Sequence, residues 1–183
     1  MTDTIVRSGL PGDWCYIDSL RKRESAALGF IPKAVYESVL ERRRVANRDR
    51  WKYQRIIVTV DNQDLTGFCM WSVYAEFSNI FQIVVQEDAR RWYRAMLMTD
   101  WVESEARQLR KDGITCRVAV DLESNIFWQA MGYIPIEQVT STWLNQRESQ
   151  SKRPLWVYKK PFADHCGLDA TKDQKRLYLP SGS

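Results

Sequence analysis

The residues best suited to chemistry lie between an apolar run and a long helical segment. Three arginines, Arg90, Arg91 and Arg94, stand where the run ends and the helix begins. Guanidinium groups bind phosphate oxygens through charge-assisted hydrogen bonds, and the free N–H groups and dipole at a helix start favour the same anions. This stretch therefore predicts a phosphate or pyrophosphate site, although arginines at a helix start also occur as plain solvated residues.

An apolar strand before this loop and an aromatic helix after it would complete the site. Residues 80–85 read as a buried central strand, residues 114–120 as a second strand, and residues 125–128 as part of a short aromatic helix. If two parallel strands separate, their backbone amides become available to an extended ligand that itself carries amides. Pantetheine is such a ligand. Taken singly, the aromatic residues are better explained as core.

Hydrophobic periodicity supplies the elements that must position these residues. Strands are expected at residues 4–7, 56–60, 65–74, 80–85, 114–120, 133–143 and 155–159, and helices at residues 14–23, 32–44 and 122–131, with a long one ending near residue 113. The fold class is α/β (α+β), a mixed, mostly antiparallel sheet of about six or seven strands with helices on both faces.

The spacing of apolar residues in the long helix predicts which of its sides is buried. An apolar stripe at helical spacing is expected to face the core, and Glu103 is expected to pair with Arg107 on the outer side. The stripe consists of Ala95, Met98, Val102, Ala106 and Leu109.

Length and composition limit the classes of function. The 183 residues fit one domain, expected over residues 1–161 and followed by a polar tail, 162–183. The single histidine, His165, lies in that tail, which argues against a Ser-His-Asp or Cys-His hydrolase. No GxxxxGK[ST] or GxGxxG motif is present, and no apolar run is long enough to span a membrane.

The four cysteines, Cys15, Cys69, Cys116 and Cys166, show no metal-binding spacing. We therefore expect no metal site, reduced cysteines and a cytoplasmic location. The net charge of +4 suits a protein that meets anionic ligands, but it is mild for a nucleic-acid-binding protein.

Two motifs make the sequence resemble the GCN5-related N-acetyltransferase (GNAT) superfamily over about residues 4–160. The superfamily motif V-x-P-E-x-R-x-x-G-x-G/A compares with VQEDARRWYRA at residues 85–95, where Arg90 and Ala95 match and Tyr93 replaces a glycine. The later motif, an aromatic residue four positions before a G-[FY] pair, matches Trp128 and the pair Gly132-Tyr133.

The resemblance implies a GNAT-like acyl-CoA N-acyltransferase fold that transfers an acetyl or other acyl group from acetyl-CoA to an unidentified amine. It places the donor on the backbone of a central strand and on the amides of the following turn, with Asn125 and Trp128 along the pantetheine or the thioester. The strand residues are Ile83, Val84, Val85 and Gln86, and the turn residues are Arg90, Arg91, Trp92, Tyr93, Arg94 and Ala95.

The acid and base of such a transfer are harder to assign. Many members of the superfamily carry a tyrosine at the position of Trp128, and an indole cannot act as an acid at neutral pH. Tyr93 is the nearest phenol in the sequence. Glu76 and Glu123 are candidate bases, although solvated carboxylates are the simpler interpretation of both, and water is the alternative to all three.

A second interpretation stays open beside the enzyme. Tyr93 and Trp128 are also compatible with an inactive GNAT-fold binding module that contacts nucleic acid or a protein partner through the basic residues 42–55, and a homodimer is compatible with either. The sequence does not identify the acceptor or the acyl group.

Overall fold

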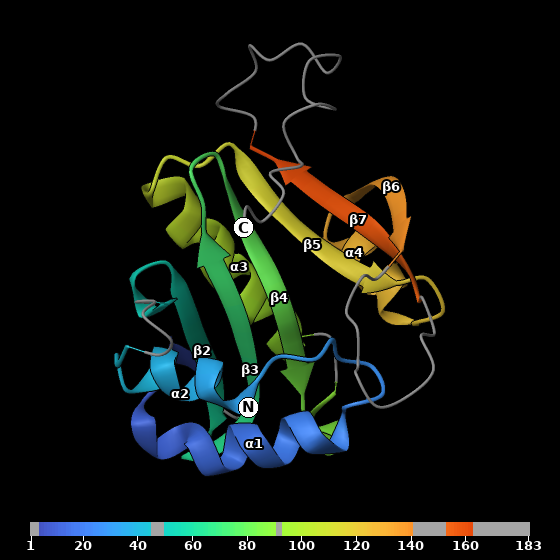
Figure 1. Ribbon diagram of the computed structural model, residues 1–183. Helices are drawn as coiled ribbons and strands as arrows, with labels where there is room; N and C mark the ends of the chain where they lie inside the picture. The colour runs from blue at the N-terminus through green and yellow to red at the C-terminus, as the bar shows by residue number, and fades with distance from the viewer. Residues whose placement is uncertain (1–3, 45–49, 91–92, 141–152, 163–183) are drawn as a thin grey trace.

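The computed structural model describes residues 4–44, 50–90, 93–140 and 153–162 (Figure 1). A single sheet of seven strands in the order β1-β2-β3-β4-β5-β7-β6 is covered by helices on both faces. The strands are β1 Thr4–Ser8, β2 Gln54–Asp61, β3 Asp64–Val73, β4 Phe77–Val85, β5 Gly113–Ala119, β6 Ile134–Thr140 and β7 Pro154–Pro161. The helices are α1 Trp14–Arg23, α2 Lys33–Leu40, α3 Tyr93–Gln108 and α4 Ser124–Ala130, with 3-10 turns η1 Pro11–Asp13, η2 Arg50–Lys52 and η3 Glu87–Ala89. The predicted fold class and order of elements are confirmed.

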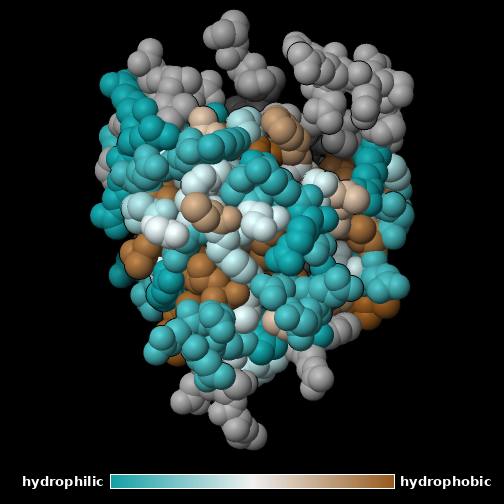
Figure 2. All heavy atoms as spheres, turned by 90° about the horizontal axis from the view of Figure 1, so that it is seen from below, coloured by the Kyte–Doolittle hydropathy of each residue, from teal (hydrophilic) through white to brown (hydrophobic). Residues whose placement is uncertain are grey.

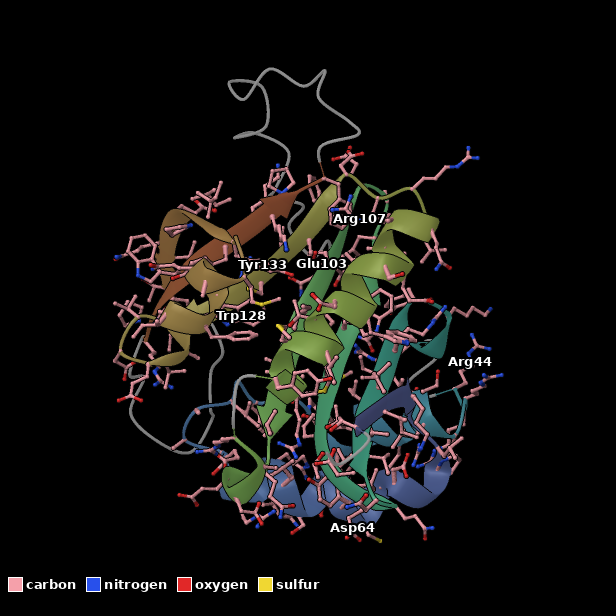
Figure 3. The ribbon with its side chains drawn as sticks, turned by 180° about the vertical axis from the view of Figure 1, so that it is seen from behind. Arg44, Asp64, Glu103, Arg107, Trp128 and Tyr133 are labelled. Atoms are coloured by element: carbon pink, nitrogen blue, oxygen red, sulfur yellow. The ribbon has the colours of Figure 1, made fainter. Side chains whose placement is uncertain are left out.

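Two apolar cores lie on opposite faces of the sheet. Helices α1 and α2 cover one face, and α3 and α4 cover the other, as Figures 1 and 3 show from the front and the back. Strand β4 contributes to both cores, because its side chains alternate between the faces. Fully buried members of the first core are Ile17, Leu20, Val58, Phe68 and Met70, and those of the second are Ile57, Cys69, Met98, Val102, Ala106, Ile114 and Tyr158.

Helix α3 corrects two details of the sequence analysis. Met98, Val102 and Ala106 are fully buried as predicted, but Leu109 is 46% exposed because the helix ends just before it. Glu103 does not form the expected outer pair with Arg107. It is buried and forms an ion pair with Lys160 of β7, with 2.7 Å between Nζ and Oε1.

The chain beyond β7 begins in the core. Phe162, the first residue of the predicted polar tail, is 3% exposed and lies under the guanidinium of Arg107, 3.8 Å from ring centroid to Cζ. The rest of that tail, residues 163–183, lies outside the described residues. No helix in the described ranges is long and apolar enough to cross a membrane.

A partly buried ion pair fixes the entry of the chain into α1. Arg7 of β1 donates two hydrogen bonds to the carboxylate of Asp13, at 2.7 and 2.9 Å, and the amide of Leu10 donates a third at 2.8 Å. Burial alone would raise the pKa of Asp13, but these donors outweigh it and leave that pKa below its usual value.

We predict that Asp13→Asn lowers the free energy of unfolding by about 1–3 kcal/mol at neutral pH, because a charged, buried hydrogen-bond acceptor is lost. Since the folded-state pKa of Asp13 is lowered, its stabilisation is complete above the unfolded pKa of about 3.9 and is lost as pH falls through the folded value. Urea unfolding of both proteins near neutral pH and at about pH 2.5 measures this. A difference that persists undiminished in acid would contradict the assignment.

Candidate functional site

The only parallel pair of strands in the described sheet is joined over a short stretch. Strands β4 and β5 pair from Phe77↔Gly113 to Ile80↔Cys116 and no further. Beyond that point β4 continues along β3 as far as Val85, and β5 continues along β7. The facing edges of Phe81–Val85 and Arg117–Ala119, here called the wedge, therefore separate from each other (Figure 1).

An extra residue in β4 marks the point of separation. Met70 of β3 pairs with Gln82, but the next residue, Trp71, pairs with Ile80, so Phe81 is a β-bulge. A bulge bends its strand and increases the local twist. Because Ile80 is also the last residue paired to β5, we attribute the opening of the wedge to this bend.

A side-chain hydrogen bond holds the closed end of the wedge. Thr115 of β5 donates from Oγ1 to Oδ1 of Asn79 on β4 at 3.0 Å, and these two residues also pair through their backbones. The bond lies one residue pair before the strands part. It keeps the separation from extending further along the sheet.

The open edge of β4 presents backbone groups to β5. The amide of Gln86 donates to the carbonyl of Thr66 at 2.8 Å, which directs Gln86 toward β3. Because successive residues of a strand direct their backbone groups to opposite edges, Ile83 and Val85 direct theirs into the wedge. Of the four predicted strand residues, these two have backbone groups that a ligand in the wedge would meet, whereas Val84 and Gln86 bond toward β3.

Fewer turn amides are available than the sequence suggested. The amide of Arg90 donates to the carbonyl of Glu87 and that of Ala89 to the carbonyl of Gln86, within η3 and its two caps. The first N–H groups of α3 belong to Tyr93, Arg94 and Ala95, and an α-helix leaves its first N–H groups without internal partners. The predicted residues Arg91 and Trp92 lie outside the described ranges.

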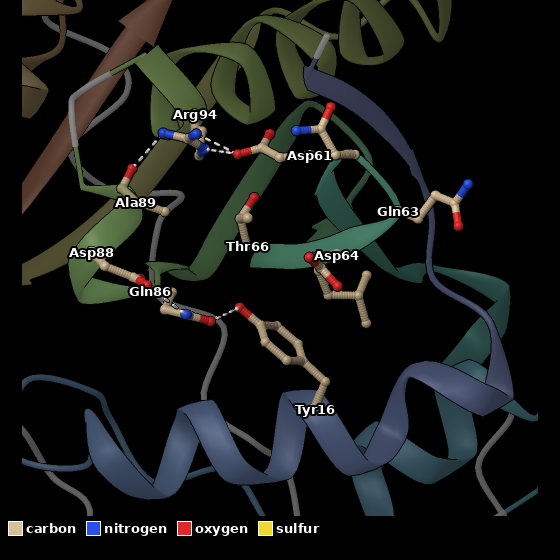
Figure 4. A pocket seen from close by; sticks show the side chains of 11 residues that line it. Tyr16, Asp61, Gln63, Asp64, Thr66, Gln86, Asp88, Ala89 and Arg94 are labelled. Carbon is tan, nitrogen blue, oxygen red and sulfur yellow. Dashed lines mark hydrogen bonds and ion pairs between the residues drawn. The ribbon is translucent and has the colours of Figure 1, made fainter. Parts of the chain in front are cut away.

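Both described arginines of this turn already hold carboxylates. Arg90 forms an ion pair with Glu24 at the end of α1, with 2.5 Å between Nη2 and Oε1, and its Nε donates to the carbonyl of Val85 at 3.2 Å. Arg94 binds Asp61 at the end of β2 and donates to the carbonyl of Ala89 at 2.7 Å (Figure 4). The Arg94 side chain therefore braces the turn against the β2–β3 hairpin.

A polar cavity of about 710 Å³ lies beyond this brace, between α1, the hairpin and η3 (Figure 4). Its polar lining includes Asp61, Asp64 and Asp88, which does not suit a phosphate. Tyr16 donates to Gln86 across it at 3.2 Å, and burial raises the pKa of Tyr16 to about 12. Figure 2 shows the end of the molecule that carries α1, where hydrophilic residues cover most of the surface.

The side chains of Trp128 and Asn125 in α4 contact other residues of the protein. Trp128 is 3% exposed and packs edge-on against Phe127 and Tyr133, with ring centroids 5.2 and 4.9 Å apart (Figure 3). Asn125 donates to the carbonyls of Ala119 and Leu122 at 2.9 and 2.6 Å and accepts from Tyr158 at 3.0 Å. These contacts join α4 to the open end of β5, so the ligand role predicted for these two side chains stays a prediction.

Tyr133, the second residue of the Gly132-Tyr133 pair, has a buried phenol. Its hydroxyl has no hydrogen-bond partner among the described residues, and it lies near Glu103 and Lys160 (Figure 3). Burial, together with the carboxylate of Glu103, raises its pKa far above the usual value. It therefore stays neutral and is a poor proton donor to a thiolate.

The three predicted catalytic residues lie in different places. Glu76 is exposed before the first residue of β4, nine residues or about 30 Å along the strand from Val85, so the structure does not bring it to the wedge. Glu123 is exposed at the start of α4, on the edge where the wedge opens. Tyr93 is 51% exposed at the start of α3.

Gln82 is a site residue whose role the sequence did not reveal. It is 4% exposed, follows the bulge directly, accepts a hydrogen bond from Tyr36 of α2 and donates to the carbonyl of Gly29 at 2.7 Å. Burial raises the pKa of Tyr36 to about 12. A polar residue within an apolar strand could have drawn attention to Gln82. Its partners, Tyr36 and Gly29, lie far away in the sequence and could not be predicted from it.

The sequence matches no protein-family model and no curated protein significantly. Its fold matches solved structures over most of the chain. Arabidopsis thaliana NAA60 in complex with acetyl-CoA superposes with a TM-score of 0.69 at 11% identity, covering 87% of this chain and 98% of that one. Ard1 from Thermoplasma volcanium gives 0.65 at 16% identity, covering 86% and 97%.

The ribosomal-protein-S18-alanine N-acetyltransferase from Escherichia coli gives a TM-score of 0.66 at 12% identity, covering 87% of this chain and 94% of that one. At such identities the likeness concerns the fold. This protein therefore has the GNAT fold of acyl-CoA N-acyltransferases, as its sequence motifs suggested.

Gly67 of β3 sets how closely β3 approaches the open half of β4. A Cβ at this position would lie 2.6 Å from the carbonyl oxygen of Val84 and 2.9 Å from Oγ1 of Thr59. The Val84 contact is with backbone, so a larger side chain must displace β4 itself.

We predict that Gly67→Ala lowers the free energy of unfolding by about 1–3 kcal/mol, because the added methyl overpacks a fixed backbone. Gly12→Ala is the matched control, since nothing lies within 4 Å of a Cβ there, and it should change stability by less than about 0.5 kcal/mol. Denaturant unfolding measures both. Equal effects of the two substitutions would contradict the close approach of β3 and β4.

Proposed function

We propose that this protein is an acyl-CoA-dependent N-acyltransferase that transfers an acetyl group to an amine. The observation that carries the proposal is the unpaired edge of β4, where Ile83 and Val85 direct backbone groups into the wedge next to the first amides of α3. An extended arm with alternating N–H and C=O groups suits such an edge, because it can complete the missing ladder. A helix start beside it suits the phosphates at the end of that arm.

The fold supports the same ligand. One of the solved structures with this fold, Arabidopsis thaliana NAA60, contains acetyl-CoA. In this chain, the donor would meet Ile83 and Val85 through its amides, and Tyr93, Arg94 and Ala95 through its phosphates. Arg90 would supply a guanidinium once it leaves its present partners. No group of three or more metal-ligating side chains is arranged for a metal in the described residues, and the proposal uses none.

The reaction would join the amine nitrogen to the thioester carbon and break the C–S bond, with the amine losing a proton and the thiolate gaining one. Gln82 and Asn79 are the polar side chains of β4 nearest the bulge, and neither is a base at neutral pH. We therefore assign removal of the amine proton to water. Glu123 is the one predicted carboxylate that lies on the edge where the wedge opens. Tyr93 is the exposed phenol available at the turn.

The alternative function, a nucleic-acid-binding module that uses the basic residues 42–55, has less support than the enzyme. Arg43 is engaged by two carboxylates, Glu37 at 3.0 Å and Glu41 at 2.8 Å, which reduces the cationic character of that surface. Residues 45–49 of the segment lie outside the described ranges. We therefore keep the enzyme as the single proposed function.

We predict that acetyl-CoA binds with micromolar affinity and that Arg90→Glu weakens binding at least about tenfold, since a charged hydrogen bond contributes roughly 1.5–3 kcal/mol. Isothermal titration calorimetry measures this. Arg110→Glu is the control, because it makes the same charge change beyond the opposite end of α3. Absence of binding at millimolar acetyl-CoA, or equal losses in the two variants, would refute the proposed donor site.

Turnover tests the chemistry separately from binding. We predict that a panel of amines, including peptide N-termini and small polyamines, contains at least one that accelerates release of the CoA thiol at least about tenfold over hydrolysis, because proximity to a bound thioester favours attack. A thiol-reactive dye detects the release. Acetyl-CoA binding without release by any amine would support an inactive module in place of the enzyme.

A further inference from the structure

The connection between α1 and α2 crosses the wedge. This segment, residues 24–31, is here called the strap, and in Figure 1 it runs in blue from the end of α1 past the lower end of β4. On the β4 side, the carbonyl of Gly29 accepts a hydrogen bond from Gln82 at 2.7 Å. On the β5 side, Arg153 donates to the carbonyl of Ala26 at 2.8 Å and pairs with Asp121, which lies just beyond β5. The strap is thus tied to both sides of the wedge.

Polar contacts hold the strap more than burial does. Leu28 and Ile31 are only partly buried against the core, and Phe30 is 58% exposed. Segments with few buried apolar contacts open locally at a small fraction of the global unfolding free energy. The strap is therefore a segment that can move while the sheet stays intact.

The ion pair between Glu24 and Arg90 is a third tie between the strap and the wedge within the described ranges. Glu24 is the C-cap of α1, where a negative charge is disfavoured by the helix dipole, and Arg90 offsets this at 2.5 Å. The same guanidinium donates to the carbonyl of Val85, a group that faces the wedge. Arg90 therefore joins the strap to the backbone edge on which the donor is proposed to bind.

We infer that Arg90 is a latch that the acyl donor opens. The inference rests on the proposed function, because the donor's amide would take the Val85 carbonyl from Arg90 and its phosphates would compete with Glu24 for the guanidinium. Binding of the donor then removes the Glu24 tie and loosens the strap. The tie also costs donor affinity, because it must break before the donor is fully bound.

Hydrogen–deuterium exchange with CoA as the probe tests the latch. In the wild-type protein, CoA should speed exchange of the amides of residues 25–30. Glu24→Gln should show this faster exchange without CoA, and it keeps the fold because it removes a disfavoured charge from a helix end. It should also bind CoA about 1.4- to 5-fold more tightly, since exposed ion pairs contribute about 0.2–1 kcal/mol and each 1.4 kcal/mol is tenfold in affinity.

Glu37→Gln is the matched control. Glu37 is also a partly exposed glutamate, with 19% of its side chain accessible against 23% for Glu24, and it pairs with Lys33 and Arg43 away from the strap. This variant should leave both strap exchange and CoA affinity unchanged. The comparison separates loss of the latch from loss of a surface ion pair in general.

The possible outcomes distinguish failure of the latch from failure of the proposed donor site. CoA binding with unchanged or slower strap exchange overturns the latch and leaves the donor site standing. Weaker CoA binding by Glu24→Gln also overturns the latch, because Glu24 would then favour CoA binding and not oppose it. Absence of CoA binding to the wild-type protein overturns the donor site and the latch together.

Discussion

The structure depends on a parallel strand pair that stops after four residue pairs. Strands β4 and β5 separate beyond Ile80, where β4 continues along β3 to Val85 and β5 continues along β7, and the Phe81 bulge bends β4 at that point. Backbone groups left unpaired inside a protein are costly unless water or a ligand meets them. The proposed donor site therefore rests on this open edge.

The remaining elements stabilise this divergence from several sides. Gly67 allows β3 to approach the open half of β4 closely, and the Thr115–Asn79 hydrogen bond holds the closed end. Asn125 links α4 to the end of β5, and Arg94 ties the start of α3 to the β2–β3 hairpin. These contacts fix the positions of the elements around the wedge.

Charge near the wedge is more balanced than the arginine-rich turn suggested. Arg90 and Arg94 are both held by carboxylates from elements far away in the sequence, Glu24 and Asp61. At Arg90 and Arg94 an anionic ligand therefore competes with carboxylates that are already bound. Of the two pairs, the one at Arg90 is more accessible, because 48% of its side chain is exposed against 16% for Arg94.

The sequence by itself determined the order of elements and the mixed sheet, because hydrophobic periodicity is a local signal. The Arg90–Ala95 and Trp128–Tyr133 motifs are local as well, and the place of the site that they predict stays a prediction. The predicted ends of some elements were wrong: the second helix stops at Leu40 rather than near residue 44, and Phe162 belongs to the core. Only the tertiary structure decided the side-chain partners, such as Glu103 with Lys160 and Gln82 with Tyr36. Such pairs join residues 46 and 57 positions apart, and no local pattern encodes which distant strand or helix will cover a given side chain.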